Sequence, residues 1–173
     1  ISYAPKGVES LYPDADGFVR GYGETALASV AATDRCVEVP GVTWHGQPDL
    51  VGRAEPDLAS LPSPLLTGAL PLDGQRHMRW ETQRGCPYRC TFCQHREHAS
   101  RLRNNRLPID RLRDEIVLFS LSGLEEIDVL DPIFNVGRDY LSILEELARR
   151  KVRARISHQS RIELVTPEIL DMC

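Results

Sequence analysis

Residues 78–93 read Met-Arg-Trp-Glu-Thr-Gln-Arg-Gly-Cys-Pro-Tyr-Arg-Cys-Thr-Phe-Cys, and the fold prediction starts from this run. Its beginning, Met78 to Thr82, is a candidate strand. The strand leads directly into three closely spaced cysteines, Cys86, Cys90 and Cys93. Three thiolates this close together can hold one metal centre from a single loop, and thiolates are the usual ligands of iron–sulfur clusters. Three ligands leave one iron of a four-iron cluster open, as an enzyme needs if its substrate is to bind the cluster.

A structural zinc site is the alternative for the same cysteines, with His95 or His98 as the fourth ligand. Structural zinc sites usually pair two short cysteine knuckles, and this sequence has one. The loop also follows the first predicted strand of a series of strands and helices. Parallel α/β folds place their active sites at the carboxyl ends of the strands. The sequence therefore favours a catalytic cluster over zinc and leaves zinc as the alternative.

The rest of the chain after the cysteines alternates helix and strand patterns. Apolar residues at helical spacing and short apolar strand runs follow one another as Ile109–Leu121, Ile127–Leu130, Asp139–Arg150 and Val152–Ile156, and a third helix begins at Thr166. Repeated strand–helix units predict parallel strands with helices packed outside them. An open sheet and a barrel both fit this pattern.

The region before residue 75 differs from the rest of the chain in its proline and glycine content. Six of the twelve prolines lie between Pro40 and Pro71, which predicts a linker, with a short hairpin over Val37–Trp44 at its start. Before it, Gly17–Arg20 is typical of the end of a strand and the segment Gly21–Thr25 of a turn into a helix. Such a glycine-rich turn can offer backbone N–H groups to an anion. It can equally be a tight turn that needs a positive φ.

Composition narrows the class of protein. The chain has 173 residues, a formal net charge of −4 and 42% hydrophobic residues, which gives no reason to expect nucleic acid as a partner. No apolar run is long enough to span a membrane. Five cysteines, three of them in one short cluster, indicate a reducing compartment, and we expect the cytoplasm. The chain begins at Ile1 and ends at Cys173 in a newly started helix, so we expect a longer native protein.

The spacing Cys86-x-x-x-Cys90-x-x-Cys93, with Phe92 before the last cysteine, resembles the signature of the radical S-adenosylmethionine (SAM) superfamily. The longer string 81–93 is similar to the branch that carries an N-terminal cobalamin-binding domain, and segments like 16–24, 39–44 and 57–64 follow one another in that branch.

The resemblance implies an α/β fold in three parts. Residues 1–35 would be the end of a Rossmann-like cobalamin-binding domain. Residues 36–74 would be the hairpin and the linker, and residues 75–173 the first half of a partial TIM-type barrel, the radical SAM core.

The resemblance also implies roles for single residues. Cys86, Cys90 and Cys93 would bind three irons of a 4Fe-4S cluster, and the fourth iron would take the amino and carboxylate groups of SAM. The backbone around Phe92 would meet the adenine. Asp131, in Leu130-Asp131-Pro132, stands where the superfamily often has a Gly-Gly-Glu-Pro-like element, and it is the candidate for the SAM amino group.

Further candidate residues lie before the cysteines and after Asp131 in the sequence. Gln159 and Arg161 resemble positions that touch the ribose or the carboxylate of SAM, with solvated polar residues as the alternative. Gly21, Gly23 and Glu24 would belong to the cobalamin-binding part. No side chain is assigned to direct catalysis.

The implied function is that of a cobalamin-dependent radical SAM methyltransferase. It would methylate an unreactive carbon of a small molecule, amino acid or peptide in natural-product biosynthesis, and tryptophan methylation is one assignment. In the usual scheme of the branch the products are S-adenosylhomocysteine, 5′-deoxyadenosine and methylated substrate. A cobalamin-dependent radical SAM cyclase or rearrangement enzyme is the alternative within enzymes, and a zinc- or cluster-stabilised binding module is the alternative outside them.

Six arginines and one acidic residue lie between Arg84 and Arg106. Such a basic run is often only a solvated surface. Beside a cluster it can also steer an acidic electron donor such as flavodoxin or ferredoxin. The sequence favours the second interpretation.

Overall fold

The structure is a computed structural model that describes residues 8–33, 38–47, 54, 57–93, 106–136 and 139–172. The chain divides into two compact units, Ile1–Asp57 and Leu58–Cys173, which are described separately. The boundary between them lies inside the predicted linker 36–74. In the described parts of the chain, no helix is long and apolar enough to cross a membrane.

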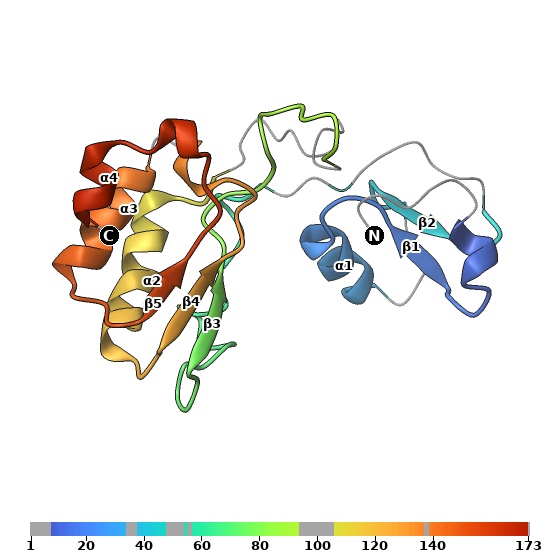
Figure 1. Cartoon of the computed structure of the whole chain (residues 1–173). Helices are drawn as coiled ribbons and strands as arrows, with labels where there is room; N and C mark the ends of the chain where they lie inside the picture. The colour runs from blue at the N-terminus through green and yellow to red at the C-terminus, as the bar shows by residue number, and fades with distance from the viewer. Residues whose placement is uncertain are drawn as a thin grey trace. The chain divides into compact units, whose positions relative to one another are not determined.

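The described residues of unit 1, Ile1–Asp57, include a short antiparallel sheet and one α-helix. Strand β1 (Gly17–Val19) pairs with β2 (Val42–Trp44), and helix α1 covers Glu24–Ala31 (Figure 1). A 3-10 turn, η1 (Val8–Leu11), precedes them. The described residues of this unit show a two-stranded antiparallel sheet, and the Rossmann-like parallel sheet that the resemblance implies is not seen among them.

The turn of the predicted hairpin over 37–44 is present. The N–H of Val42 donates to the carbonyl of Val39 at 3.0 Å, and Gly41 adopts a φ of 80°. The strand after this turn, β2, pairs with β1, and Val37, where the predicted hairpin begins, lies outside the described residues. The proline–glycine pair predicts the turn, but the choice of partner strand depends on the tertiary structure.

Unit 2, Leu58–Cys173, is built on a parallel sheet with the strand order β3-β4-β5. The three strands are β3 (His77–Trp80), β4 (Glu126–Val129) and β5 (Arg155–Ser157). Helix α2 (Ile109–Leu121) connects the first two, and α3 (Tyr140–Arg149) connects the second pair, followed by α4 (Pro167–Met172). The predicted parallel strand–helix units are confirmed, and their bounds agree with the sequence to within a few residues.

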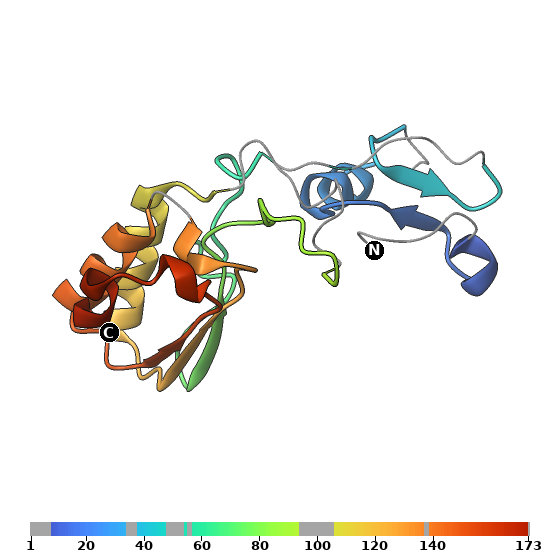
Figure 2. The same ribbon diagram turned by 45° about the horizontal axis from the view of Figure 1, so that its top comes forward.

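The core of unit 2 lies between the sheet and its helices. Met78 and Trp80 alternate with exposed residues along β3, and Ile127 and Val129 are the buried positions of β4. Figure 2 shows the yellow-to-red helices α2 to α4 along one face of this sheet. The indole of Trp80 meets the ring of Phe119 edge to face, with centroids 5.3 Å apart. The alternate positions of the strands carry polar side chains: His77, Arg79, Glu126, Asp128, Arg155 and Ser157.

Part of the predicted linker belongs to this core. Leu58 is fully buried, Leu65 is 9% exposed, and Leu61 and Leu72 pack against the same cluster of apolar residues. Residues 58–72 are therefore a packed segment of unit 2 despite their prolines, because their leucines find apolar partners that the sequence alone does not show.

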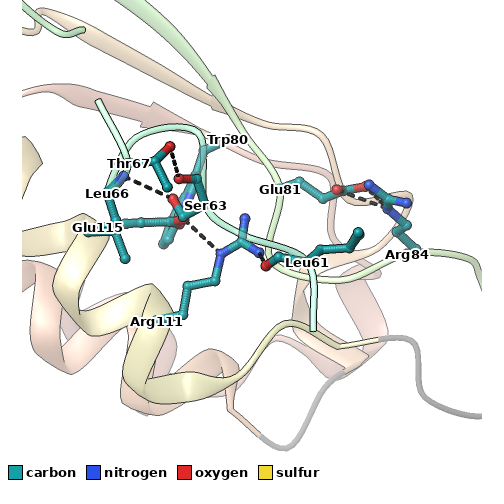
Figure 3. A network of polar contacts seen from close by, with 9 residues as sticks. All are labelled: Leu61, Ser63, Leu66, Thr67, Trp80, Glu81, Arg84, Arg111 and Glu115. Carbon is teal, nitrogen blue, oxygen red and sulfur yellow. Dashed lines mark hydrogen bonds and ion pairs between the residues drawn. The ribbon is translucent and has the colours of Figure 1, made fainter. Parts of the chain in front are cut away.

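A buried polar network holds this segment in place (Figure 3). The carboxylate of Glu115 on α2 accepts hydrogen bonds from Ser63 Oγ at 2.6 Å and from Trp80 Nε1 at 2.7 Å. Arg111 Nε donates to the same carboxylate at 2.9 Å, and its Nη1 donates to the carbonyl of Leu61 at 2.8 Å. A buried carboxylate is stable only when it is paired in this way. The network ties residues 61–63 to the helix and to β3.

Candidate cluster-binding site

The candidate site lies at the carboxyl edge of the sheet in unit 2. Because β3, β4 and β5 are parallel, the segments that follow them begin at the same edge. Hydrogen bonds link these segments to one another. The N–H of Leu130 donates to the carbonyl of Trp80, and the N–H of Phe134 donates to the carbonyl of Gln159, both at 2.7 Å. The sheet thus brings residues from 81–93, 130–136 and 158–164 together.

The cysteine loop, residues 85–93, opens with Gly85, which is buried and has a φ of 78°. Only glycine adopts that conformation readily, so it allows the sharp turn away from the end of β3. Cys86 is buried, Cys90 and Cys93 are half-buried, and all three thiols are free. The N–H of Cys93 donates to the carbonyl of Cys90 at 3.1 Å. A short turn therefore places the last two thiols on neighbouring parts of the loop.

The chemistry of the donors bears on the choice between an iron–sulfur cluster and zinc. All three are cysteine thiols, and thiolates are the usual ligands of iron–sulfur clusters. In the part of the chain that the structure describes, no three side chains of His, Cys, Asp or Glu are grouped so that they could hold one metal ion. The histidines of the zinc alternative, His95 and His98, lie outside the described residues.

The base of the cysteine loop is fixed by polar contacts. Arg84 Nε donates to the carboxylate of Glu81 at 2.9 Å (Figure 3). Gln83 bridges to Arg106 in an antiparallel pair, and the N–H of Leu107 donates to the carbonyl of Thr82 at 3.0 Å. The chain is thus held on both sides of the segment 94–105.

Asp131 is buried beneath the loop, with 1% of its surface exposed. Its Oδ1 accepts the N–H groups of Thr82 at 2.9 Å and Gln83 at 3.2 Å, and its Oδ2 accepts the hydroxyl of Thr82. Burial raises the pKa of Asp131, and the hydrogen bonds from Thr82 and Gln83 oppose that rise. Both oxygens accept hydrogen bonds inside the protein, and these bonds anchor the end of β3 to the loop after β4. The contact of Asp131 with the amino group of SAM stays a prediction.

Arg161 reaches the cysteine loop from the segment after β5. Its Nη1 lies 3.9 Å from Cys90 Sγ, and its Cζ lies 4.0 Å from the centre of the Tyr88 ring. The structure therefore places Arg161 against the cysteine loop, and its contact with SAM stays a prediction. Gln159 and Phe92 are exposed, Phe92 to 92%. An exposed aromatic residue beside the cysteines is free to meet a bound cofactor.

Gly21 of the proposed cobalamin-binding part has a structural explanation within unit 1. Gly21 has a φ of 95°, and the N–H of Tyr22 donates to the carbonyl of Ala54 at 2.9 Å. A Cβ on Gly21 would lie 2.4 Å from that carbonyl oxygen, so a side chain does not fit. Gly23 precedes α1, and Glu24 is its first residue. The tight-turn alternative therefore accounts for Gly21.

Three residues of the site were not predicted from the sequence: Thr82, Tyr88 and Asn135. Thr82 and Tyr88 belong to the quoted run, but nothing in their spacing indicates a partner 49 or more residues away. Asn135 is buried and binds the backbone of Arg161. The sequence around an asparagine in a loop does not indicate which residue its side chain will bind. Their roles follow from which loops the parallel sheet brings together.

The site and fold agree with the comparison to known families. Residues 80–172 match the model of the radical SAM superfamily, which is more than half of the chain, and the chain belongs to this superfamily. Membership implies a 4Fe-4S cluster and SAM as cofactors. The superfamily predicted from the cysteine motif is confirmed.

Two curated proteins share sequence with most of the chain. The cobalamin-dependent radical SAM methyltransferase TokK of Streptomyces tokunonensis is 31% identical over 170 residues, covering 87% of this chain and 24% of that protein. The 2-(S-pantetheinyl)-carbapenam-3-carboxylate methyltransferase of Streptantibioticus cattleyicolor is 35% identical over 156 residues, covering 79% of this chain and 22% of that protein. The chain thus spans about a quarter of the length of these relatives.

Proposed function

We propose that this chain is part of a cobalamin-dependent radical SAM methyltransferase that methylates an unreactive carbon in the biosynthesis of a natural product. The observation that carries the proposal is the extent of the similarity to two methyltransferases. Unit 2 makes up about two thirds of the chain, so matches over 87% and 79% of it extend into unit 1. The similarity therefore includes more than the cluster-binding core that the whole superfamily shares.

In this proposal Cys86, Cys90 and Cys93 are the cluster ligands. When bound, the cluster and SAM supply the radical chemistry, and the protein supplies their position and surroundings. The cysteine loop holds three thiols at the carboxyl edge of the sheet. Phe92 is exposed next to them, where its backbone can meet the adenine of SAM, and Gln159 lies exposed beyond β5, where it can contact the ribose.

The cobalamin part of the proposal is supported by the name of the relative TokK and by the sequence segments in unit 1. We assign residues 1–35 to the end of the cobalamin-binding domain, with Gly21, Gly23 and Glu24 in its strand-to-helix turn. Residues 36–74 connect it to the core at 75–173. The contact of Gly21 with Ala54 explains its conformation within unit 1.

A small-molecule carboxylate is the substrate class that we propose to test first. One relative is named for a carbapenam carboxylate, which favours a bicyclic small molecule over a peptide. Methylation of tryptophan in a peptide is the second class. The electron would come from an acidic carrier such as flavodoxin or ferredoxin, which the arginines near the cysteine loop would attract, among them Arg84, Arg89 and Arg106.

The proposal is tested with the full-length protein under anaerobic conditions, supplied with SAM, cobalamin, a reductant and a carbapenam carboxylate. We expect methylated product, S-adenosylhomocysteine and 5′-deoxyadenosine, and no methylated product with the Cys90→Ala variant. Turnover that is unchanged without cobalamin would contradict the proposal. 5′-deoxyadenosine with a product that gained no methyl group would support the cyclase alternative.

Metal and sulfide analysis separates the enzyme from the binding module. Anaerobic reconstitution should give about four irons and four sulfides per chain, as a 4Fe-4S cluster requires. Stoichiometric zinc without sulfide would favour the zinc-stabilised module.

A further inference from the structure

Arg161 is held against the cysteine loop on two sides. Its guanidinium stacks over the ring of Tyr88, with 4.0 Å between Cζ and the ring centre, and its Nη1 is 3.9 Å from Cys90 Sγ. Arginine keeps its positive charge and stacks well on aromatic rings. A permanent positive charge therefore lies next to one of the three proposed cluster ligands.

Asn135 fixes the backbone of Arg161. Its Oδ1 accepts the N–H of Arg161 at 2.9 Å, and its Nδ2 donates to the carbonyl of the same residue at 2.9 Å. Asn135 is 4% exposed. An amide that satisfies both backbone groups of one residue leaves that residue little freedom to move, because either shift would leave a buried polar group without a partner. The loop after β4 thus sets the position of Arg161.

Glu163 balances part of this charge from the other side. Arg161 Nε donates to the carboxylate of Glu163 at 2.5 Å, whereas Nη1 points to the cysteine. The side chains are 31% and 53% exposed, so solvent screens the ion pair and its effect is modest. Because the two side chains carry opposite charges, removing Arg161 or removing Glu163 should change the electrostatic potential at the sulfur with opposite sign.

We propose that Asn135 and Tyr88 hold Arg161 beside Cys90 so that its charge stabilises the reduced form of the cluster. Reduction adds one electron, and hence one negative charge, from a low-potential one-electron donor, and no bond is formed or broken in the protein. Hydrogen bonds to the sulfurs and nearby charges are known determinants of cluster potential. The proposal rests on the cluster assignment and not on cobalamin or methyl transfer.

The test is a redox titration of the reconstituted full-length protein without SAM, with dithionite as the reductant and the electron paramagnetic resonance signal of the reduced cluster as the readout. Arg161→Gln should weaken electron uptake about tenfold, a shift of about 59 mV to more negative potential for a one-electron couple. Arg161→Lys, which keeps the charge and loses the stacked guanidinium, should shift it less. Asn135→Ala should shift it in the same direction although no charge is removed.

Two further variants make the sign of the effect measurable. Glu163→Gln removes the opposing charge and should move the potential the other way. Arg155→Gln is the matched control, because it removes the same charge from the first residue of β5, at the opposite end of the strand. The control should leave the potential unchanged.

An unchanged potential in Arg161→Gln would overturn the proposal. If the same variant binds SAM more weakly at unchanged potential, Arg161 acts on SAM, as the resemblance implies, and the tuning role is wrong. A wild-type protein that takes up no iron would overturn the cluster assignment itself. Iron analysis shows that failure before any variant is titrated.

Discussion

Thr82 binds Asp131 twice, through its backbone N–H at 2.9 Å from Oδ1 and through its hydroxyl to Oδ2. Asp131 is the second residue after β4, and Thr82 is the second after β3, so this pair joins the ends of two neighbouring parallel strands. The cysteine loop begins three residues further on. The position of the three cysteines proposed as cluster ligands therefore depends on Asp131, which the resemblance assigns to the amino group of SAM.

Asp131→Asn tests this anchor. An amide offers one acceptor where the carboxylate offers two, so at least one buried donor of Thr82 or Gln83 loses its partner at a cost of about 1–3 kcal/mol. We expect a lower free energy of unfolding and less iron bound after reconstitution, measured by urea denaturation and iron analysis. Asp128→Asn, on the polar face of β4, is the control and should keep the iron content. Normal stability and iron content with weaker SAM binding would instead support the contact with the amino group.

The cysteines themselves give the most direct prediction. Replacing Cys86, Cys90 or Cys93 with Ala removes one of the three proposed ligands, and we expect each variant to lose the cluster. The absorbance near 400 nm that is typical of iron–sulfur proteins should disappear with it. Cys36→Ala, outside the motif, is the matched control and should keep the absorbance. A full cluster in any of the three variants would show that another residue takes part.

Ser63→Ala tests the attachment of residues 58–72 to unit 2. Ser63 donates to the buried carboxylate of Glu115 and accepts the N–H of Leu66 at 3.2 Å. Its loss should lower the free energy of unfolding by about 1–3 kcal/mol, because both partners lose a hydrogen bond. Ser120→Ala removes a hydroxyl that bonds only its own helix, at Val117, and should cost less than about 0.5 kcal/mol. Equal costs in urea denaturation would contradict a special role for the network.

The half-buried side chain of His158 should make the free energy of unfolding depend on pH. Burial lowers its pKa from the ordinary value of 6.5, and its ring lies against Phe134 with centroids 4.8 Å apart. The unfolded chain then binds a proton more readily than the folded one. The stability due to neutral His158 is thus present above pH 6.5 and is lost as the pH falls through the lower folded pKa.

The measurement is the melting temperature at about pH 7.5 and about pH 5.5. The decrease at the lower pH should be smaller in His158→Gln than in the wild type. His45→Gln removes an exposed histidine from unit 1 and should leave the wild-type decrease intact. An equal decrease in all three proteins would assign the acid sensitivity to other groups.

The sequence alone determined the features that depend on local spacing. The helix Ile109–Leu121 was predicted with the bounds it has, because apolar residues at a period of 3.6 define a buried face without reference to any partner. The cysteine spacing identified the superfamily for the same reason, since ligands on one loop are close together whatever the rest of the chain does. The turn at Pro40-Gly41 is equally local.

Only the tertiary structure decided which of these segments meet. In the folded protein β2 pairs with β1, and the leucines of residues 58–72 pack in the core of unit 2. The carboxylate of Asp131 binds Thr82 just after β3. The tertiary structure also placed Asn135 under Arg161, and Arg161 beside Cys90. The β1–β2 pairs and the contact between Arg161 and Cys90 join residues 23 to 71 positions apart in the chain, and nothing in the local sequence pattern of either partner indicates them. The parallel sheet decides the contacts of Asp131, Asn135 and Arg161, because it brings the segments after its three strands to one edge.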